Sequence, residues 1–287
     1  MRPGGSLESA ARPGPAGEST KTMVSPNLSL YLSIAIYAVA AGLVFLSLLT
    51  RRETLQRIAT AAVMGGFVTH TIWIGTICST THHPPLMNLP EAASFLAWLL
   101  VVVELGLLFR YKVQAAAFFV YPLVVILLAT AAIVSEPFSP PTPEQSSKIF
   151  IGHLLLTLIG IATLLIGLAF GALYQMQDRA MKAKKRGALY DWIPNLRVLD
   201  LVSYRSMVLG FAIYSAGILA GVLYAYNRHG ALTSFSAKEL GALVAWVAFA
   251  AILQSHLSGT FRTRKTAGVA LVAFLAIVVS IFGIDRG

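Results

Sequence analysis

The chain contains few charged residues and only one cysteine. Charged residues make up 12% of the 287 residues and hydrophobic residues 56%, and the mean hydropathy is +0.73. An ordinary soluble domain has about twice that share of charged residues. Because Cys78 is alone, the chain can form neither an internal disulfide nor a Cys-x-x-Cys thiol relay. These shortages indicate a membrane protein that does no thiol chemistry of its own.

Motifs for hydrolysis and phosphate binding are also missing. The sequence contains no phosphate-binding loop, no His-Glu-x-x-His zinc helix and no nucleophile elbow. We therefore predict no catalytic residue, and we do not expect the chain to be an enzyme by itself.

Eight apolar blocks dominate what is present. The longer blocks reach the ~20 residues that a helix needs to cross a bilayer. No polar stretch between them is long enough for a second core, so the sequence predicts an all-α membrane helix bundle with one membrane domain over residues 27–287. Residues 1–26, rich in Gly, Pro, Ser and Ala, are predicted to be a disordered tail. The blocks are residues 28–50, 58–78, 92–109, 114–134, 149–174, 207–226, 240–258 and 266–284.

Lysine and arginine are distributed unevenly between the connections. Fifteen of the 22 fall in the connections after the first, third, fifth and seventh blocks. The positive-inside rule makes these connections cytoplasmic, which predicts eight transmembrane helices in the cytoplasmic membrane with both termini outside. Because this topology accounts for most of the net charge of +10, no basic face is left for a nucleic acid.

Two features of the predicted membrane domain have open interpretations. The connection over residues 175–206 combines the runs MKAKKRG and LYDWIPNLRVLD. A contact with anionic membrane lipid plus a helix in the membrane interface is one interpretation, and a docking site for a cytoplasmic partner is the other. Glu104 interrupts the third block, where an ionised group is costly. We expect Glu104 to face the bundle and to be protonated or hydrogen-bonded.

The segment from Leu199 to Tyr226 carries the most specific pattern, LDLVSYRSMVLGFAIYSAGILAGVLYAY. Its start is predicted to lie along the membrane surface, with Arg205 among the lipid headgroups, and an uncharged run of about 20 residues follows. Small residues recur along that run, so neighbouring helices can approach closely. The string LDxxSYRxxxxGFxxxxxGIxxG is similar to the helix before the tryptophan-rich outer loop of the cytochrome c assembly family. That family includes CcsA-type haem-handling proteins and HemX-like relatives.

Two further segments carry the resemblance, which spans roughly residues 58–284. Residues 83–98, HPPLMNLPEAASFLAW, resemble the family's GHFPLSNLYES segment and the helix after it. Residues 238–246 resemble the end of the family's WDPKE motif and the following helix.

The chain departs from the family pattern around the tryptophan motif. Residues 233–241, TSFSAKELG, align with WxWDPKExW but contain no tryptophan, so the loop has lost most of the aromatic surface that would stack on a porphyrin. The family's histidine in the next helix aligns with Gln254, and no histidine follows the last block. The chain is therefore identified as a divergent member with a degenerate tryptophan-rich loop. Such a member binds haem weakly, differently or not at all.

The histidines are the candidate ligands, and depth in the membrane separates them. A haem needs one or two axial imidazoles in an apolar slot. His153 lies within about one turn of the outer end of the fifth block, and His83 lies in an outer connection that a Pro-Pro pair stiffens. These two are the leading haem-binding candidates, and the resemblance adds that His153 matches an axial ligand of the family's outward-facing haem. Intramembrane histidines often only hydrogen-bond neighbouring helices, and outer-loop histidines are usually solvated. The weaker candidates are therefore His70, His82, His229 and His256. No metal other than haem iron is predicted.

The resemblance implies haem as a cofactor and leaves the function open between classes. The first hypothesis is cytochrome c biogenesis, in which the chain presents haem at the outer face to an apocytochrome c together with a second membrane protein. The second is a HemX-like regulator of haem synthesis that acts through its cytoplasmic loop without delivering haem. The third, a transporter of another small molecule, gains no support from an internal repeat or a pair of interrupted helices.

Overall fold

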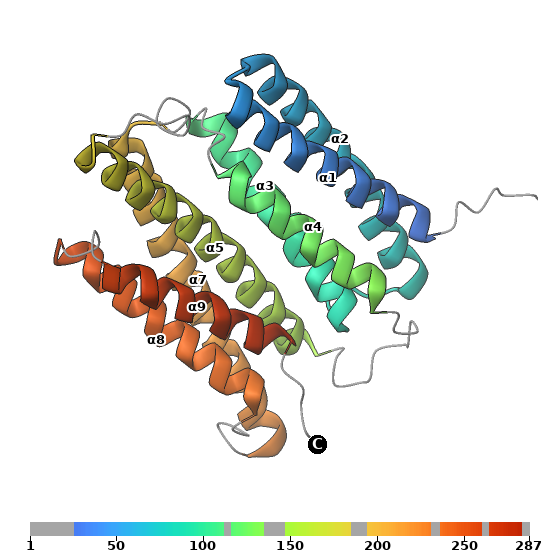
Figure 1. Cartoon of the computed structure of the whole chain (residues 1–287). Coiled ribbons are helices and arrows are strands. Elements are labelled where there is room, and N and C mark those ends of the chain that lie inside the picture. The colour runs from blue at the N-terminus through green and yellow to red at the C-terminus, as the bar shows by residue number, and fades with distance from the viewer. Residues whose placement is uncertain are drawn as a thin grey trace, which may run out of the picture.

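The computed structural model describes residues 26–111, 116–134, 147–184, 194–230, 236–259 and 264–282. Every regular element in these ranges is an α-helix, which confirms the predicted all-α class (Figure 1). The predicted disordered tail, apart from Pro26, lies outside the described residues. The helices are α1 (Pro26–Thr50), α2 (Glu53–Thr81), α3 (Leu89–Tyr111), α4 (Ala117–Ile133), α5 (Lys148–Lys182), α7 (Leu196–His229), α8 (Ala237–Leu257) and α9 (Arg264–Phe282).

Each predicted apolar block coincides with one of these eight helices. Six of them, α1, α2, α3, α5, α7 and α8, are long and apolar enough to cross a membrane. Helix α4 and the Gly268–Ser280 part of α9 are apolar but shorter. The longest helices run well past their apolar blocks because polar residues without Pro or Gly continue the helical pattern, as in α5 up to Lys182.

Successive helices alternate in direction, so the helix ends gather at two ends of the bundle (Figure 1). We call one end the basic end; it holds the end of α5 and the start of α7. We call the other the histidine end; it holds the α2–α3 connection and the start of α5. The start of α1 and the end of α9 both lie at the histidine end (Figure 1). The helix ends beside the connections predicted to be cytoplasmic therefore lie at one end of the bundle (Figure 1).

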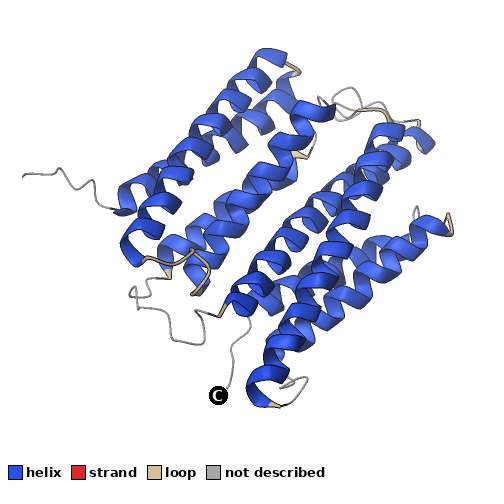
Figure 2. Ribbon diagram, turned by 180° about the vertical axis from the view of Figure 1, so that it is seen from behind, coloured by secondary structure: helices blue, strands red, loops and turns tan. Residues whose placement is uncertain are grey.

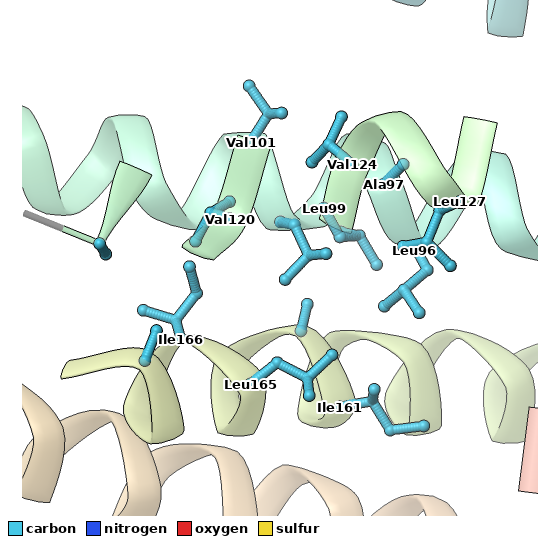
Figure 3. Packing of buried hydrophobic residues seen from close by; sticks show 14 of the residues in the cluster. Leu96, Ala97, Leu99, Val101, Val120, Val124, Leu127, Ile161, Leu165 and Ile166 are labelled. Atoms are coloured by element: carbon cyan, nitrogen blue, oxygen red, sulfur yellow. The ribbon is translucent and has the colours of Figure 1, made fainter. Parts of the chain in front are cut away.

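The bundle consists of two groups of helices joined by an apolar interface. Helices α1–α4 pack together, as do α5 and α7–α9, and α3 and α4 contact α5 (Figure 2). Leucine, valine and isoleucine side chains from α3, α4 and α5 fill the interface, among them Leu96, Val124, Ile161 and Leu165 (Figure 3). Because this contact is apolar, it separates the buried polar side chains within α1–α4 from those of the other group.

Helix α7 corrects one sequence-based prediction. The segment at residues 199–206, predicted to lie along the membrane surface, is part of one continuous helix with the span that follows. Leu199 and Ser203 are fully buried, and the Ser203 hydroxyl donates a 2.9 Å hydrogen bond to the Gly167 carbonyl of α5. The Arg205 guanidinium donates a 3.2 Å hydrogen bond to the Tyr111 hydroxyl. The segment stays in the bundle because α5 is long enough to cover it.

Candidate functional site

Helices α5 and α7 pack along a line of glycines, which we call the glycine seam: Gly160, Gly167, Gly210, Gly217 and Gly221. A Cβ atom added at Gly160 would lie 2.7 Å from the backbone of Tyr214, and one at Gly210 would lie 2.9 Å from the Leu164 nitrogen. No ordinary side chain fits at such distances. The three α7 glycines belong to the string that resembles the family. Their close contact with α5 is a physical reason for glycine at these positions.

His153 lies in the glycine seam, about 7.5 Å along α5 from its start at the histidine end. Its Nδ1 is 2.7 Å from the Gly217 carbonyl oxygen and 3.4 Å from the Thr157 hydroxyl. Since a carbonyl only accepts hydrogen bonds, Nδ1 carries the proton. In the neutral ring the lone pair is therefore on Nε2, the nitrogen left for a metal.

The room for the His153 imidazole depends on Gly221. A Cβ atom there would lie 2.7 Å from both Cε1 and Nδ1 of the ring. The aromatic rings of Phe150 on α5 and Tyr224 on α7 contact each other with centroids 5.1 Å apart, one turn from His153 and Gly221 respectively. The imidazole is thus half-buried, oriented by a backbone carbonyl and close to an aromatic pair.

This arrangement fits a haem ligand. Metal-bound histidines almost always donate their second ring N–H to a carbonyl, a carboxylate or water, which fixes the tautomer and the orientation of the ring. His153 already makes that bond, with a partner from the neighbouring helix.

His83 belongs to a compact cluster in the α2–α3 connection. Its Nδ1 is 2.9 Å from the Pro84 carbonyl and 3.9 Å from Glu91 Oε2. Glu91 and Asn88 form the N-terminal cap of α3: the Glu91 backbone N–H donates to Asn88 Oδ1, and the Asn88 side-chain Nδ2 donates to Glu91 Oε1. The Met87 backbone amide donates to the second Glu91 oxygen. The start of the family-like segment at residues 83–98 therefore caps helix α3, whatever other role it has. No interaction among the described residues joins His83 to His153.

His70 is enclosed by the first group of helices. Its side chain is fully buried, its Nε2 is 2.9 Å from the Ser94 hydroxyl of α3, and its ring lies edge-on to that of Tyr37, 6.0 Å away. His70 thus lies on the far side of the α3–α5 interface from His153.

His256 lies at the basic end, about 28 Å along α8 from its start. Its Nδ1 is 3.9 Å from Asp200 Oδ1, and its ring is 5.4 Å from that of Tyr204. Asp200 and Tyr204 belong to the family-like LDxxSYR string, so that string packs against α8. His256 and His153 lie at opposite ends of the bundle and do not share a site.

The remaining outer residues contribute less to a site. His82 is exposed and ends α2, and the side chain of His229, the last residue of α7, lies outside the described residues. The Ser236 hydroxyl accepts a hydrogen bond from the Glu239 amide, so the retained Lys238-Glu239 pair lies in the cap of α8. Residues 233–235, the first three of the segment aligned with the tryptophan motif, lie outside the described residues, and the degeneracy of the motif stays a prediction.

Glu104 faces the interior of the bundle as expected. It is 1% exposed, and its Oε2 accepts a 3.1 Å hydrogen bond from the Tyr121 hydroxyl of α4. The sequence-based reasoning did not identify Tyr121 as its partner because no local pattern links the two helices.

Sequence-based reasoning also missed the second half of the His153 environment. The Gly217 carbonyl and the Gly221 space come from α7, 64 residues or more further along the chain. The one available signal was the GIxxG end of the family-like string, which predicts close helix packing but does not name α5 or His153 as the partner.

Comparison with known proteins identifies the family of the chain. Residues 86–286, more than half of the chain, match the family model described as Cytochrome C assembly protein. The chain belongs to the cytochrome c assembly protein family. It is therefore a multi-pass membrane protein of the cytochrome c biogenesis and HemX group, and the family predicted from the sequence is confirmed.

Its relatives fall under two names. The chain is 25% identical over 239 residues to Cytochrome c biogenesis protein CcsA of Guillardia theta, covering 76% of this chain and 79% of that protein. It is 25% identical over 258 residues to Protein HemX of Bacillus subtilis, covering 87% of this chain and 91% of that protein.

A solved structure shares the fold. Cytochrome c Heme Lyase CcmF superposes with a TM-score of 0.71 at 15% sequence identity, covering 97% of this chain and 49% of that one. This chain thus spans about half the length of that protein, and at this identity the likeness shows the fold alone.

Proposed function

We propose that this protein handles haem at the outer face of the cytoplasmic membrane during cytochrome c biogenesis. In this proposal the histidine end faces outward and the basic end faces the cytoplasm, in accordance with the distribution of lysine and arginine. Haem, when bound, supplies an iron that takes one or two axial imidazoles. His153 is the principal axial ligand and His83 the second.

The observation that carries the proposal is the hydrogen bond from His153 Nδ1 to the Gly217 carbonyl. It leaves Nε2 as the ligating nitrogen and holds the ring before any ligand arrives. His83 has the same arrangement, because its Nδ1 bonds to the Pro84 carbonyl. The partners are an apocytochrome c and a second membrane protein. Because Cys78 is the only cysteine, another protein must keep the thiols of the apocytochrome reduced.

The test is the haem that copurifies with the protein, measured as pyridine haemochrome. Three variants are compared with the unmodified chain: His153→Ala, His83→Ala and the double variant. Loss of one imidazole should leave a weaker and altered low-spin spectrum, and loss of both should abolish haem retention. His82→Ala is the matched control, because His82 is an exposed neighbour of His83 in the same connection. Unchanged haem content in the double variant would remove both residues from the site.

Two observations favour a second candidate, a regulator of haem synthesis that does not deliver haem. The similarity to HemX of Bacillus subtilis covers 91% of that protein, and the segment aligned with the tryptophan motif contains no tryptophan. The same purification separates the candidates. If the unmodified chain carries no haem when haem is plentiful, the regulator is favoured, and the basic connection between α5 and α7 becomes the place to search for a partner.

A further inference from the structure

A string of polar side chains runs through the interior of α1–α4, away from the candidate haem site. Its members come from all four helices and are almost completely buried. Four of them have 0% exposure and Glu104 has 1%. We call this set the α1–α4 string: Ser94, His70, Tyr37, Tyr121 and Glu104.

Adjacent members of the string interact. His70 Nε2 is 2.9 Å from the Ser94 hydroxyl, and the Tyr121 hydroxyl donates to Glu104 at 3.1 Å. Between these two pairs lies Tyr37 of α1, whose ring is edge-on to His70 at 6.0 Å. Helix α1 also packs against α4, the helix that carries Tyr121. The Tyr37 ring also lies over Gly66 of α2, where an added Cβ atom would be 3.0 Å from its Cε1. The position of Tyr37 between the pairs is therefore set by close packing.

Several polar atoms along the string lack a hydrogen-bond partner within the part of the chain that the structure describes. They are the Tyr37 hydroxyl, His70 Nδ1, Glu104 Oε1 and Trp73 Nε1, and the Trp73 ring lies 6.3 Å from that of His70. Buried polar groups in native proteins are almost always paired, with protein or with ordered water. Four unsatisfied atoms on neighbouring side chains therefore indicate small polar molecules between them, and water is the simplest that both donates and accepts.

The string is ordered in depth. Ser94 and Glu104 are ten residues apart on α3, about 15 Å along the helix axis, with Ser94 nearer the histidine end and Glu104 nearer the basic end. At the histidine end, Glu91 lies one turn before Ser94 on α3 and is itself 1% exposed. Chains of carboxylate and histidine side chains inside a membrane domain are typical of proton relays.

The surroundings leave few competing groups. Helix α5, which packs against α3 and α4, contributes apolar side chains such as Ile161, Leu165 and Ile166 to that interface (Figure 3). Among the described residues, the titratable side chains seen in contact along the string are its own members: Tyr37 from α1, His70 from α2, Glu104 from α3 and Tyr121 from α4. Trp73 on α2 adds an N–H group but does not titrate.

We propose that the α1–α4 string is a hydrated proton path that loads Glu104 from the histidine end. A proton taken up by His70 at one ring nitrogen is released from the other. The hydroxyls of Tyr37 and Tyr121, with water between them, each receive one proton and pass on another. The net change is one proton lost from the medium at the histidine end and one carboxylate of Glu104 converted to the acid. This path is separate from the haem proposal, since its members include neither His153 nor His83, and His70, a weaker candidate from the sequence, is enclosed within α1–α4.

The test follows the protonated carboxyl group of Glu104 in the purified full-length protein by infrared spectroscopy. The carbonyl stretching band that disappears in Glu104→Gln belongs to this group. Transfer from H₂O to D₂O then shifts that band at the rate at which protons reach Glu104. Tyr37→Phe removes a hydroxyl that has no hydrogen-bond partner among the described residues, so the variant should fold. It should slow the exchange by about tenfold or more, since each tenfold corresponds to a barrier higher by about 1.4 kcal/mol.

Two further variants keep the result decisive. His70→Gln should slow the exchange in the same way, and it replaces Tyr37→Phe if that variant does not fold. Tyr214→Phe is the control, because it removes a buried tyrosine hydroxyl from the other group of helices, where Tyr214 donates to the Ala242 carbonyl. Equal exchange rates in all variants would overturn the proposal, as would equal slowing in the control. Absence of any band that depends on Glu104, at every pH at which the protein stays folded, would also overturn it.

Discussion

The substitution Gly221→Ala tests whether the glycine seam holds His153 ready for a ligand. The added Cβ atom would lie 2.7 Å from two atoms of the imidazole, whereas ordinary van der Waals contact begins at 3.4 Å. The ring or the helix must therefore move by several tenths of an ångström. One of these two ring atoms is Nδ1, which donates the hydrogen bond to the Gly217 carbonyl. The substitution should therefore strain or break this bond.

Two terms set the expected size of the effect on stability. Overpacking costs about 1–3 kcal/mol, and alanine in place of glycine within a helix gains about 1 kcal/mol. The net loss of unfolding free energy is therefore about 0–2 kcal/mol, small enough to leave a folded protein. The effect on haem affinity should be easier to detect than the effect on stability. Loss of a group that orients a metal-bound histidine typically reduces affinity about 10–100-fold.

The assay is haem titration by visible absorbance together with thermal unfolding in detergent. Gly152→Ala is the matched control: Gly152 precedes His153 on α5, and an added Cβ atom there meets nothing within 4 Å. The control should bind haem like the unmodified chain and unfold at the same temperature or a slightly higher one. If Gly221→Ala also binds haem unchanged, the seam does not orient the ligand.

Three further outcomes follow from the fold. Reporter fusions at Lys184 should report the cytoplasm and those at Gly230 the outer side, and an outer signal at Lys184 would disprove the topology. Asn88→Ala removes the N-cap of α3 that Glu91 completes, so unfolding in detergent should show a loss of about 1 kcal/mol, and no loss would mean that the cap is dispensable. Gly160→Leu places a side chain against the backbone of α7, so size-exclusion chromatography should show misfolded or aggregated protein, and a normal elution profile would contradict the close contact of α5 with α7.

The sequence alone was sufficient to predict the helical class and the number and approximate position of the helices. Helices that cross a membrane must satisfy their own backbone groups and be apolar along about 20 residues. Both requirements are local, so they are visible in the order of the residues. The family was also predictable, because the LDxxSYR string and the 83–98 segment are long and specific. Glu104 could be predicted to face inward because an ionisable group facing lipid is costly.

The partners of each side chain were decided only by the tertiary structure. Whether His153 is a prepared ligand depends on a carbonyl oxygen of Gly217 and on the space at Gly221, both supplied by another helix. The α1–α4 string likewise combines residues from four helices, such as Tyr37 and Tyr121, that are far apart in the chain. The start of α7 was mispredicted for the same reason, since its polarity suggested the membrane surface while α5 covers it. Contacts between helices depend on how the helices are rotated and offset against one another, and that is determined by packing between segments that no local pattern in the sequence describes.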